Sequence, residues 1–476
     1  LEYGKGYYLI EVQAPYGYTL NPDPVYFDIT AEDATEEGGI TVVNVTKSNM
    51  PQKGVIHITK TGEVFQSVVT NDNMYKPVYE VSNLPGAVFE IRAAENVYTL
   101  DGVLHYKKGE LVDTITTGSD GIATSKELYL GKYDIQEITA PHSMVLNGKI
   151  QTVELVYSGQ EISITETSGN LYNERQKMEV HLSKVLEQNE LFGIGMNEEL
   201  KNISFGLYAQ TDIVAADGTM IPADGLIEII TFDENGKAVC STDLPLGSYY
   251  LQERTTDAHY ILNDTKYEFT FSYASQDTKV VEITVNDGAA IENELKYGSV
   301  SGLKVDEDGK VIAGAVFGLF SNEETEYTRE NAFMVTESAK DGTFKFENVP
   351  YGTWVVREIE PATGFVLNEK AYQVTIAEDG DVVEIKLENR YIRGDIEGLK
   401  LDEDGNTITG AVFGLFKDGE TEFTEDTAVL ISETDSEGKF RFEDLRFGKW
   451  IVRELKPAIG YVLNEKPDRK STRLNS

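Results

Sequence analysis

Three chemically active side chains, a lysine, a glutamate and an asparagine, recur along the sequence on strand faces that are otherwise apolar. Side chains of a strand alternate between its two faces, so each predicted strand divides into an inward and an outward set. The lysines of 178–184 (MEVHLSK) and 56–60 (IHITK) fall on the apolar face. A lone buried charge is costly unless it is paired or neutralised. A cost that is repeated along the chain indicates a chemical purpose for these lysines.

The glutamate and the asparagine occupy matching positions on two further predicted strands. Glu137 shares the face of Tyr133 and Ile135, and Asn173 shares the face of Leu171. The same pattern along the chain gives three candidate triads, which are Lys60–Glu137–Asn173, Lys184–Glu253–Asn293 and Lys304–Glu358–Asn389. Two incomplete sets remain, which are Glu11 with Asn44 and Lys400 with Glu454.

A simpler explanation exists for every triad. Each lysine could extend its amine to the surface, and each glutamate could cap a strand end. The inward phase of the lysines in the first two triads argues against this explanation. The phase of Lys304 and Lys400 is ambiguous, because Leu303 and Leu399 fall on the opposite face of their strands.

Internal repeats supply the elements that must position these residues. The string GAVFGLF occurs at 314–320 and again at 410–416, with looser copies at 86–92 and 204–210. Each copy is followed by a block such as YGTWVVREIEPATGFVLN (351–368), which contains the candidate glutamate. We expect the chain to start inside one module and to end inside another. The predicted modules are A (1–52, a C-terminal remnant), B (53–176), C (177–296), D (297–392) and E (393–467, truncated).

Composition and turn signals predict an all-β fold. Tyr (26) and Phe (20) are plentiful, as are Val, Ile and Thr, and these residues favour strands. Asp-Gly and Asn-Gly pairs at 120–121, 235–236 and 341–342 mark tight turns. We expect about seven strands per module in a two-sheet, Ig-like or prealbumin-like β-sandwich, and a linear array of such tandem modules. Modules B and C are longer than D, which we attribute to insertions after the GAVF-like strand.

The ordered set of elements resembles the Cna B-type (SpaA-like, prealbumin-like) domains of Gram-positive adhesins and pilins. The elements are the early lysine, the GAxF strand, the block Gly-x-Tyr/Trp-x-x-x-Glu-x-x-x-Pro-x-Gly-Tyr-x-Leu-Asn, and a closing strand that ends in asparagine. The resemblance covers residues 1–467. Module C departs from it, since Thr256 and Asp257 stand where the other modules have an Ala-Pro or Pro-Ala pair. This departure affects the predicted loop more than the triad.

The resemblance implies an intramolecular isopeptide bond between the lysine and asparagine side chains. An apolar core lowers the pKa of a lysine and raises that of a glutamic acid. The neutral amine then attacks the asparagine side-chain carbonyl, the glutamic acid moves the proton, and ammonia leaves. The catalytic residues would be Glu137, Glu253 and Glu358, with Glu11 and Glu454 as their counterparts in the incomplete modules. Because the reaction occurs once, the chain is not expected to be an enzyme with turnover.

Charge and missing motifs exclude several classes of protein. The formal net charge of −39 disfavours nucleic acid and anionic membrane surfaces as partners. The single cysteine, Cys240, permits no internal disulfide and is expected to be a small buried side chain. No apolar stretch is long enough to span a membrane. HExxH, GxSxG, Walker A and dinucleotide glycine patterns are also missing, so no cofactor, metal site or metabolic reaction is predicted.

Three further segments have simple interpretations. Arg393-Gly394-Asp395 can be read by integrins when it is exposed, but a linker turn before the next strand is favoured. The acidic stretches 306–309 and 402–405 hint at Ca²⁺ loops, yet they lack the length and distal glutamate of an EF-hand loop, so turns are favoured. The last residues, 468–476 (DRKSTRLNS), are basic and break the repeat, and we interpret them as a translated sequencing-adapter artefact.

The favoured function is the structural stalk of a secreted bacterial cell-surface adhesin, held at the cell wall by a C-terminal anchor outside this sequence. Each complete module would carry its own autocatalytic Lys–Asn isopeptide bond. Three alternatives stay open. They are a surface protein that binds host extracellular-matrix or cell-surface proteins directly, a pilin subunit, and a surface enzyme such as a hydrolase whose catalytic domain lies outside this sequence. Large aromatic patches on loops would favour direct binding. The lack of a YPK-like pilin motif counts against the pilin.

Overall fold

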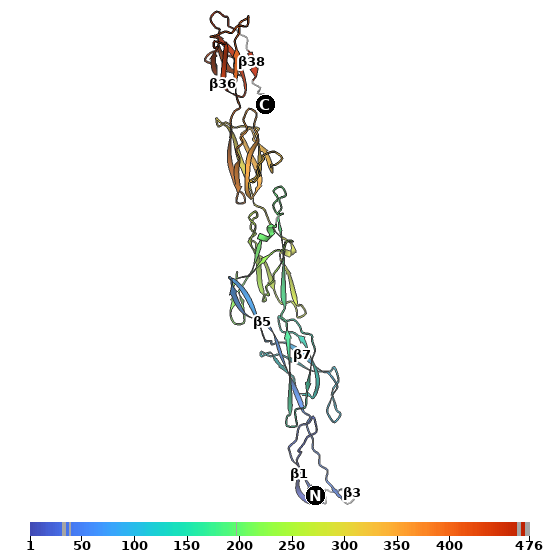
Figure 1. The fold of residues 1–476 in the computed structure, drawn as a ribbon. Helices are drawn as coiled ribbons and strands as arrows, with labels where there is room; N and C mark the ends of the chain where they lie inside the picture. The colour runs from blue at the N-terminus through green and yellow to red at the C-terminus, as the bar shows by residue number, and fades with distance from the viewer. Residues whose placement is uncertain (31–34, 38–39, 197, 464–467, 472–476) are drawn as a thin grey trace. The chain divides into compact units, whose positions relative to one another are not determined.

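The computed structural model describes residues 1–30, 35–37, 40–196, 198–463 and 468–471, which form an almost entirely β structure (Figure 1). The helical elements among them are two 3-10 turns, η1 (Glu199–Asn202) and η2 (Asn286–Gly288). No helix in this part of the chain has the length and hydrophobicity that a membrane crossing requires. The chain divides into two compact units, which are described separately. The first comprises Leu1–Val185, Leu200–Thr256 and Leu262–Glu292, and the second comprises Leu186–Glu199, Asp257–Ile261 and Asn293–Ser476.

Module D, in the second unit, shows the repeated architecture most simply. One sheet has the order β29-β26-β32, with β29 (Thr343–Pro350), β26 (Tyr297–Asp306) and β32 (Val382–Asn389). The other has the order β28-β27-β30-β31, with β28 (Met334–Glu337), β27 (Val316–Ser321), β30 (Gly352–Glu360) and β31 (Tyr372–Ile376). The prediction of a two-sheet sandwich with about seven strands is confirmed here.

The two sheets of module D enclose one apolar core. β27 begins within the GAVFGLF string (314–320), and its Phe317 and Leu319 point inward and are fully buried. Val300 and Leu387 come from the opposite sheet and are equally buried. Phe317 stacks on Phe344 of that sheet, with ring centroids 4.0 Å apart. Alternating apolar residues on short strands therefore give each sheet one face to bury against the other.

Module B, in the first unit, repeats this arrangement. Its first sheet joins β5 (Lys53–Asn71) to β11 (Ile122–Thr124), β12 (Leu128–Tyr129) and β15 (Ile164–Asn173). Its second sheet has the order β10-β7-β13-β14, with β10 (Leu111–Thr116), β7 (Val88–Ala93), β13 (Gly131–Thr139) and β14 (Gln151–Leu155). In modules B and D alike, the first and last strands are parallel neighbours, β5 with β15 and β26 with β32.

Module B contains a long insertion before the GAVF-like strand, whereas the sequence predicted insertions only after this strand. β5 continues beyond Lys60 and forms a hairpin with β6 (Met74–Asn83). In Figure 1 this blue hairpin lies beside green strands, and the Val68 amide donates a 2.8 Å hydrogen bond to Thr219 Oγ1. Two small hairpins do follow the GAVF-like strands, as predicted. They are β8 (Val97–Tyr98) with β9 (Leu104–Tyr106), and β18 (Ile213–Val214) with β19 (Met220–Ile221).

The remaining modules contain strands equivalent to those of modules B and D, but these strands pair with fewer or different neighbours. Module C contains β16 (Lys177–Leu186), β17 (Ser204–Ala209), β20 (Leu226–Thr231), β21 (Lys237–Val239), β22 (Gly247–Thr255), β23 (Tyr267–Phe271), β24 (Val280–Thr284) and β25 (Ile291–Asn293). Module A contains β1 (Gly4–Leu9), β2 (Val25–Ile29), β3 (Thr35–Glu37) and β4 (Ile40–Val42). Module E contains β33 (Arg393–Leu399), β34 (Val412–Lys417), β35 (Leu430–Glu433), β36 (Lys439–Arg446) and β37 (Lys449–Lys456).

Part of the basic terminal segment forms a strand. β38 (Asp468–Ser471) pairs antiparallel with β37, at the place that β31 occupies beside β30 in module D. Residues 464–467 and 472–476 lie outside the described part of the chain. The interpretation of 468–476 as an adapter artefact therefore stays a prediction about the origin of a segment whose first residues join a sheet.

Candidate functional site

The lysine and asparagine of module B are brought together by the parallel pairing of β5 and β15. Lys60 is the register partner of Leu171, and Asn173 lies two residues further along β15. Side chains two residues apart point to the same face of a strand. The Lys60 ammonium therefore meets the Asn173 amide, and its Nζ donates a short hydrogen bond to Asn173 Oδ1.

Glu137 reaches the same point from β13 in the facing sheet. Its Oε1 atom lies 3.0 Å from Lys60 Nζ and accepts a 3.0 Å hydrogen bond from Asn173 Nδ2. Each of the three residues is at most 1% exposed. The glutamate thus contacts both the amine and the amide nitrogen in a site that excludes water.

A phenylalanine of the GAVF string forms the wall of this site. Phe89 is the register partner of Glu137, is fully buried, and has its ring centroid 5.6 Å from Lys60 Nζ. Burial lowers the pKa of Lys60, although its hydrogen bond and charge interaction with Glu137 oppose this shift. The surroundings therefore increase the fraction of neutral, nucleophilic amine relative to an exposed lysine.

Module D contains the same constellation. Lys304 Nζ lies 3.1 Å from Glu358 Oε1 and donates a short hydrogen bond to Asn389 Oδ1. Asn389 Nδ2 donates to Glu358 Oε1 at 2.8 Å. The ring centroid of Phe317 lies 5.6 Å from Lys304 Nζ, and burial lowers the pKa of this lysine as well. The structure therefore brings all three predicted residues of this module into contact.

The ambiguous phase of Lys304 is resolved by a glycine. Val300, Gly302 and Lys304 all point inward on β26, whereas Leu303 points the other way and is half-buried. A Cβ atom at Gly302 would lie 2.0 Å from the Phe344 ring, so only glycine fits under this ring. Gly302 faces inward but carries no apolar side chain. The alternation of apolar residues along β26 therefore did not show which face Lys304 lies on.

Module C places its lysine and glutamate together in the first unit. Lys184 Nζ lies 3.7 Å from Glu253 Oε1, and neither side chain is accessible to solvent. Burial lowers the pKa of Lys184 to about 8, against the opposing charge of Glu253. Asn293 ends β25, a strand that pairs with β16, and is also buried.

The second oxygen of each glutamate is held by a backbone amide that the sequence analysis did not single out. Asn147 N donates to Glu137 Oε2 at 2.8 Å, and Asn368 N donates to Glu358 Oε2 at 2.7 Å. The same bond is formed by Asn263 N to Glu253 and by Asn21 N to Glu11. Each pair is separated by ten residues. This fixed spacing of the Leu-Asn dipeptide after the glutamate is the signal that could have identified it.

In module A the structure differs from the predicted asparagine. Asn44 is exposed, whereas Asn49 Nδ2 donates a 2.6 Å hydrogen bond to Glu11 Oε2. Hydrogen bonds to Asn21 N and Asn49 lower the pKa of Glu11. The prediction of Asn44 was therefore wrong, and Asn49 is the counterpart of Asn173. The signal was the motif Asn-x-x-Gln-Lys, which starts at both Asn49 and Asn173.

Module E contains the other incomplete set. Lys400 Nζ lies 3.0 Å from Glu454 Oε2, and the centroid of Phe413 lies 6.0 Å from the amine. The Lys400 side chain is 17% exposed, in contrast to the fully buried lysines of the complete modules. Lysine and glutamate therefore meet here as predicted, in a more open setting.

The Arg-Gly-Asp tripeptide lies within strand β33, not in the linker turn that was predicted. Arg393 forms ion pairs with Glu307 and with Asp444, the latter at 2.6 Å. Asp395 is paired with Arg441 and accepts a 3.0 Å hydrogen bond from the Asp444 amide. Both charged ends of the tripeptide are therefore engaged within the second unit.

The acidic stretches and the cysteine have structural roles. Asp306 Oδ1 accepts hydrogen bonds from the amides of Asp308 and Lys310, and Asp402 holds the turn of 402–406 in the same way. The described residues contain no group of three or more His, Cys, Asp or Glu side chains that could hold a metal ion. Cys240 is buried and its thiol donates to Glu228 Oε2, as expected for a structural cysteine.

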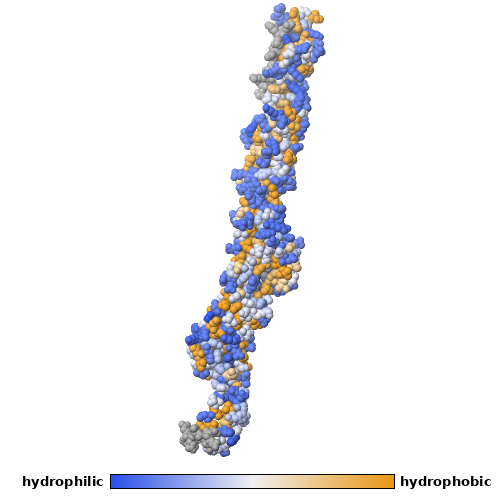
Figure 2. Space-filling view, turned by 180° about the vertical axis from the view of Figure 1, so that it is seen from behind, coloured by the Kyte–Doolittle hydropathy of each residue, from blue (hydrophilic) through white to orange (hydrophobic). Residues whose placement is uncertain are grey.

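Tyrosines gather at one position on the surface of the first unit. Tyr16, Tyr98, Tyr129 and Tyr157 line a cavity of about 470 Å³ together with Leu100. Tyr16 and Tyr98 are more than half exposed, and the rings of Tyr16 and Tyr157 lie 4.7 Å apart. Figure 2 shows hydrophobic residues in groups among hydrophilic ones on the visible face.

Four stretches of the chain match the family model of the SpaA prealbumin-like fold domain, which are residues 77–169, 193–289, 298–391 and 394–469. These matches cover most of the sequence, and the chain belongs to this family. The first match begins within the β5–β6 hairpin, because the inserted segment separates β5 from the rest of module B. No curated protein matches the chain at a significant level.

Several solved structures match the chain at low sequence identity. The Bacillus anthracis TIE protein is 18% identical, with a TM-score of 0.47 over 88% of this chain and 72% of that one. BcpA, the major pilin subunit of Bacillus cereus, is 15% identical, with a TM-score of 0.31 over 72% and 100%. The full-length major pilin SpaD from Corynebacterium diphtheriae is 15% identical, with a TM-score of 0.20 over 71% and 97%.

Proposed function

We propose that the chain is the structural stalk of a bacterial cell-surface adhesin, in which each complete module closes an intramolecular Lys–Asn isopeptide bond. The observation that carries this proposal is the mutual contact of Lys60, Glu137 and Asn173 without access to solvent, and its repetition in module D. A bond between the first and last strands would resist unfolding and proteolysis as a disulfide does. The chain has a single cysteine and so cannot form an internal disulfide.

The chemistry requires only the three side chains. The neutral Lys60 amine attacks Asn173 Cγ, so that an N–C bond forms and the bond from Cγ to Nδ2 breaks. Glu137 Oε1 takes the proton from the amine and delivers it to Nδ2, which leaves as ammonia. Both nitrogen atoms lie 3.0 Å from this oxygen, within the range that direct proton transfer needs. The Lys60 amine and the Asn173 amide become one neutral amide bond, and Glu137 returns to its starting protonation state.

Intact mass of the full chain tests this proposal. Modules B, C and D are each expected to lose one ammonia, which makes the chain three ammonias lighter than its sequence predicts. Glu137→Ala, Glu253→Ala and Glu358→Ala should each restore the mass of one ammonia, because the proton carrier of that module is removed. Glu154→Ala, on an exposed position of β14 in module B, is the matched control and should leave all three bonds in place.

An unmodified mass in the folded wild-type chain would contradict the cross-link. The chain would then be a tandem β-sandwich protein whose resistance to unfolding comes from packing alone. Loss of ammonia that persists in all three glutamate variants would also contradict the proposed role of these residues. Digestion and sequencing of the linked peptides by mass spectrometry would identify which lysine and asparagine are joined.

We also propose that the stalk is extracellular and is held at the cell wall. The acidic surface, the SpaA-type domains and the covalent reinforcement suit a protein exposed to proteases and mechanical load. A pilin subunit uses the same type of domain and is compatible with these features. Fractionation of the bacterial cells that produce the chain, followed by detection with antibodies against it, distinguishes cell-wall protein from secreted and intracellular protein.

The tyrosine-lined cavity favours a second candidate function, the direct binding of a host matrix or cell-surface protein. Exposed aromatic side chains supply much of the binding energy in protein interfaces. Binding of the chain to immobilised matrix proteins should then weaken at least about tenfold in Tyr16→Ala/Tyr157→Ala. Equal binding by this variant, or no binding by the wild type, would leave the stalk as the sole proposal.

A further inference from the structure

Asn147 differs from its counterparts in the other modules by the residue that follows it. In modules A, C and D the corresponding asparagines precede Pro22, Asp264 and Glu369, whereas Asn147 precedes Gly148. All four form the same local turn, in which the asparagine side-chain oxygen accepts a hydrogen bond from the backbone amide two residues later. The four positions therefore share one geometry and differ in the steric access to the next backbone nitrogen.

We propose that Asn147 is a site of spontaneous deamidation in the folded chain, through attack of the Gly148 backbone nitrogen on the Asn147 side-chain carbonyl. A bond forms between Gly148 N and Asn147 Cγ, the bond from Cγ to Nδ2 breaks, and ammonia leaves with the proton from Gly148 N. Solvent water then opens the resulting succinimide at either carbonyl. The products are aspartate and isoaspartate, and in isoaspartate the main chain continues through the side-chain carboxyl group.

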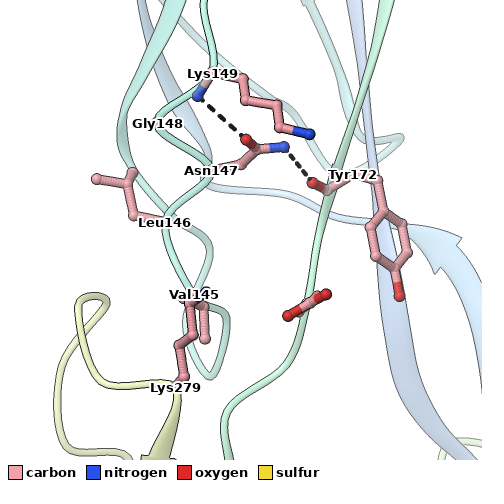
Figure 3. Close-up of a pocket in the computed structure, with 8 residues that line it drawn as sticks. Val145, Leu146, Asn147, Gly148, Lys149, Tyr172 and Lys279 are labelled. Carbon is pink, nitrogen blue, oxygen red and sulfur yellow. Dashed lines mark hydrogen bonds between the residues drawn. The ribbon is translucent and has the colours of Figure 1, made fainter.

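The turn around Asn147 favours the first step. Lys149 N donates a 3.2 Å hydrogen bond to Asn147 Oδ1, the oxygen that gains negative charge as the carbonyl is attacked (Figure 3). A backbone donor held at that oxygen stabilises the developing charge. Gly148 is exposed, and a Cβ atom there would meet nothing within 4 Å, so solvent reaches this residue. Asn147, Gly148 and Lys149 also line an open cavity of about 600 Å³, through which water can enter and ammonia can leave.

A second Asn-Gly pair provides an internal comparison. Gly236 N, after Asn235, donates a 3.0 Å hydrogen bond to Asp233 O. A Cβ atom at Gly236 would lie 2.1 Å from the Lys184 carbonyl, so this glycine is closely packed. The nitrogen that would have to attack is thus engaged and enclosed, and Asn235 is expected to remain intact in the folded chain.

Deamidation would remove a donor next to the proposed cross-link. Asn147 Nδ2 donates a 2.9 Å hydrogen bond to Tyr172 O, one residue before Asn173 on β15 (Figure 3). A carboxylate at this position has no hydrogen to donate and places a negative charge against the carbonyl oxygen. We therefore expect the modified module to lose part of the attachment between its Leu-Asn segment and β15.

Peptide mapping of the folded full chain after prolonged incubation in mildly alkaline buffer tests the proposal. The peptide with Asn147 should acquire the mass change from amide to acid, in two chromatographic forms, while the peptides with Asn235 and Asn368 remain unmodified. In Gly148→Glu, which introduces the residue type that module D has at this position, the conversion should be lost. In Glu369→Gly it should appear at Asn368, whose turn has the same hydrogen bonds.

Three results would overturn the proposal. The first is an intact Asn147 in the folded chain when the denatured chain is converted under the same conditions. The second is equal conversion of Asn147 and Asn235, which would show that the Asn-Gly sequence acts without the structural setting. The third is conversion of Asn147 that persists in Gly148→Glu. The mass changes are read at Asn147 itself, so they are independent of any cross-link at Asn173.

Discussion

Asn173 lies two residues beyond Leu171, the register partner of Lys60 on the neighbouring parallel strand. Asn389 has the same relation to Lys304 in module D. The contact between amine and amide is therefore set by backbone pairing, and no rearrangement of the strands is needed before the side chains meet. A bond at this position would join the first strand of a module to its last.

The buried lysine of module C should make stability depend on pH when the bond is prevented. In Asn293→Ala, Lys184 keeps its contact with Glu253, and burial lowers the pKa of Lys184 from 10.5 to about 8. Between these values the unfolded chain binds more protons than the folded chain. The free energy of unfolding should therefore rise as pH increases from about 8 to 10.5, by up to about 3 kcal/mol.

Chemical unfolding of module C across this pH range measures the effect. Lys184→Met/Asn293→Ala is the matched control, because it removes the titrating amine and keeps all other groups. A pH dependence that is equal in both variants would show that Lys184 is not responsible. A fall in stability with rising pH, relative to the control, would reverse the sign of the predicted shift.

The phenylalanine wall should control the rate of bond formation. Phe317→Leu removes the ring that faces Lys304 Nζ and admits water near the amine, so we expect ammonia loss in module D to slow. The shape change should cost about 1–1.5 kcal/mol of stability. Phe320→Leu is the control, since Phe320 is equally buried on the same strand and packs against Tyr327 on the other face.

A time course of intact mass after synthesis checks this prediction. Slower ammonia loss in Phe317→Leu than in Phe320→Leu supports a specific action of the ring at the reacting amine. Equal rates of ammonia loss in the two variants would mean that Phe317 contributes to core packing and not to the reaction at Lys304.

The Arg-Gly-Asp tripeptide should not mediate integrin-dependent attachment. Arg393 and Asp395 are paired within β33 and its neighbours, so neither side chain is presented as it would be on a mobile loop. Cells plated on wild-type chain and on Asp395→Glu should attach equally, with an exposed Arg-Gly-Asp peptide as the positive control. A clear loss of attachment on Asp395→Glu would show that the tripeptide becomes accessible.

Gln176 should stabilise module C through its buried side chain. It is 3% exposed, donates to the carbonyls of Ser275 and Thr278, and accepts from the Ala274 amide. Gln176→Ala would leave these groups without their partner, at a cost of about 1–3 kcal/mol. Thermal unfolding should show a lower midpoint for module C, whereas Gln188→Ala, at an exposed position, should change little. An unchanged midpoint in Gln176→Ala would mean that water replaces the side chain.

The sequence predicted the sandwich architecture and most contacts of the triads because the period of two along each strand is a local property. Lys60 and Glu137 follow this period, and the structure buries them together. Lys304 could not be assigned in the same way, because Gly302 carries no side chain to mark the inward face. The close approach of Phe344 that requires this glycine comes from another strand.

Features that depend on contacts between distant segments were missed. The β5–β6 hairpin was not predicted, because the extra length of module B was attributed to insertions after the GAVF-like strand. Its contacts with module C come from residues far along the chain. Asn44 was predicted as the asparagine of module A, and Asn49 was not singled out from the sequence. The hydrogen bond of Asn49 to Glu11 identifies Asn49 as the equivalent residue, in agreement with the Asn-x-x-Gln-Lys motif that it shares with Asn173.

The parallel pairing of first and last strands also determines how far the chain could lengthen under tension. If the proposed bonds form, a force applied at the two ends passes from Lys60 directly to Asn173, and the residues between them carry no load. Between Lys60 and Asn389, only the linkers from Asn173 to Lys184 and from Asn293 to Lys304 could then extend, and both span eleven residues. Each could reach at most about 40 Å. Hairpins inserted within a module would then change its surface while leaving the maximum extension of the tether unchanged.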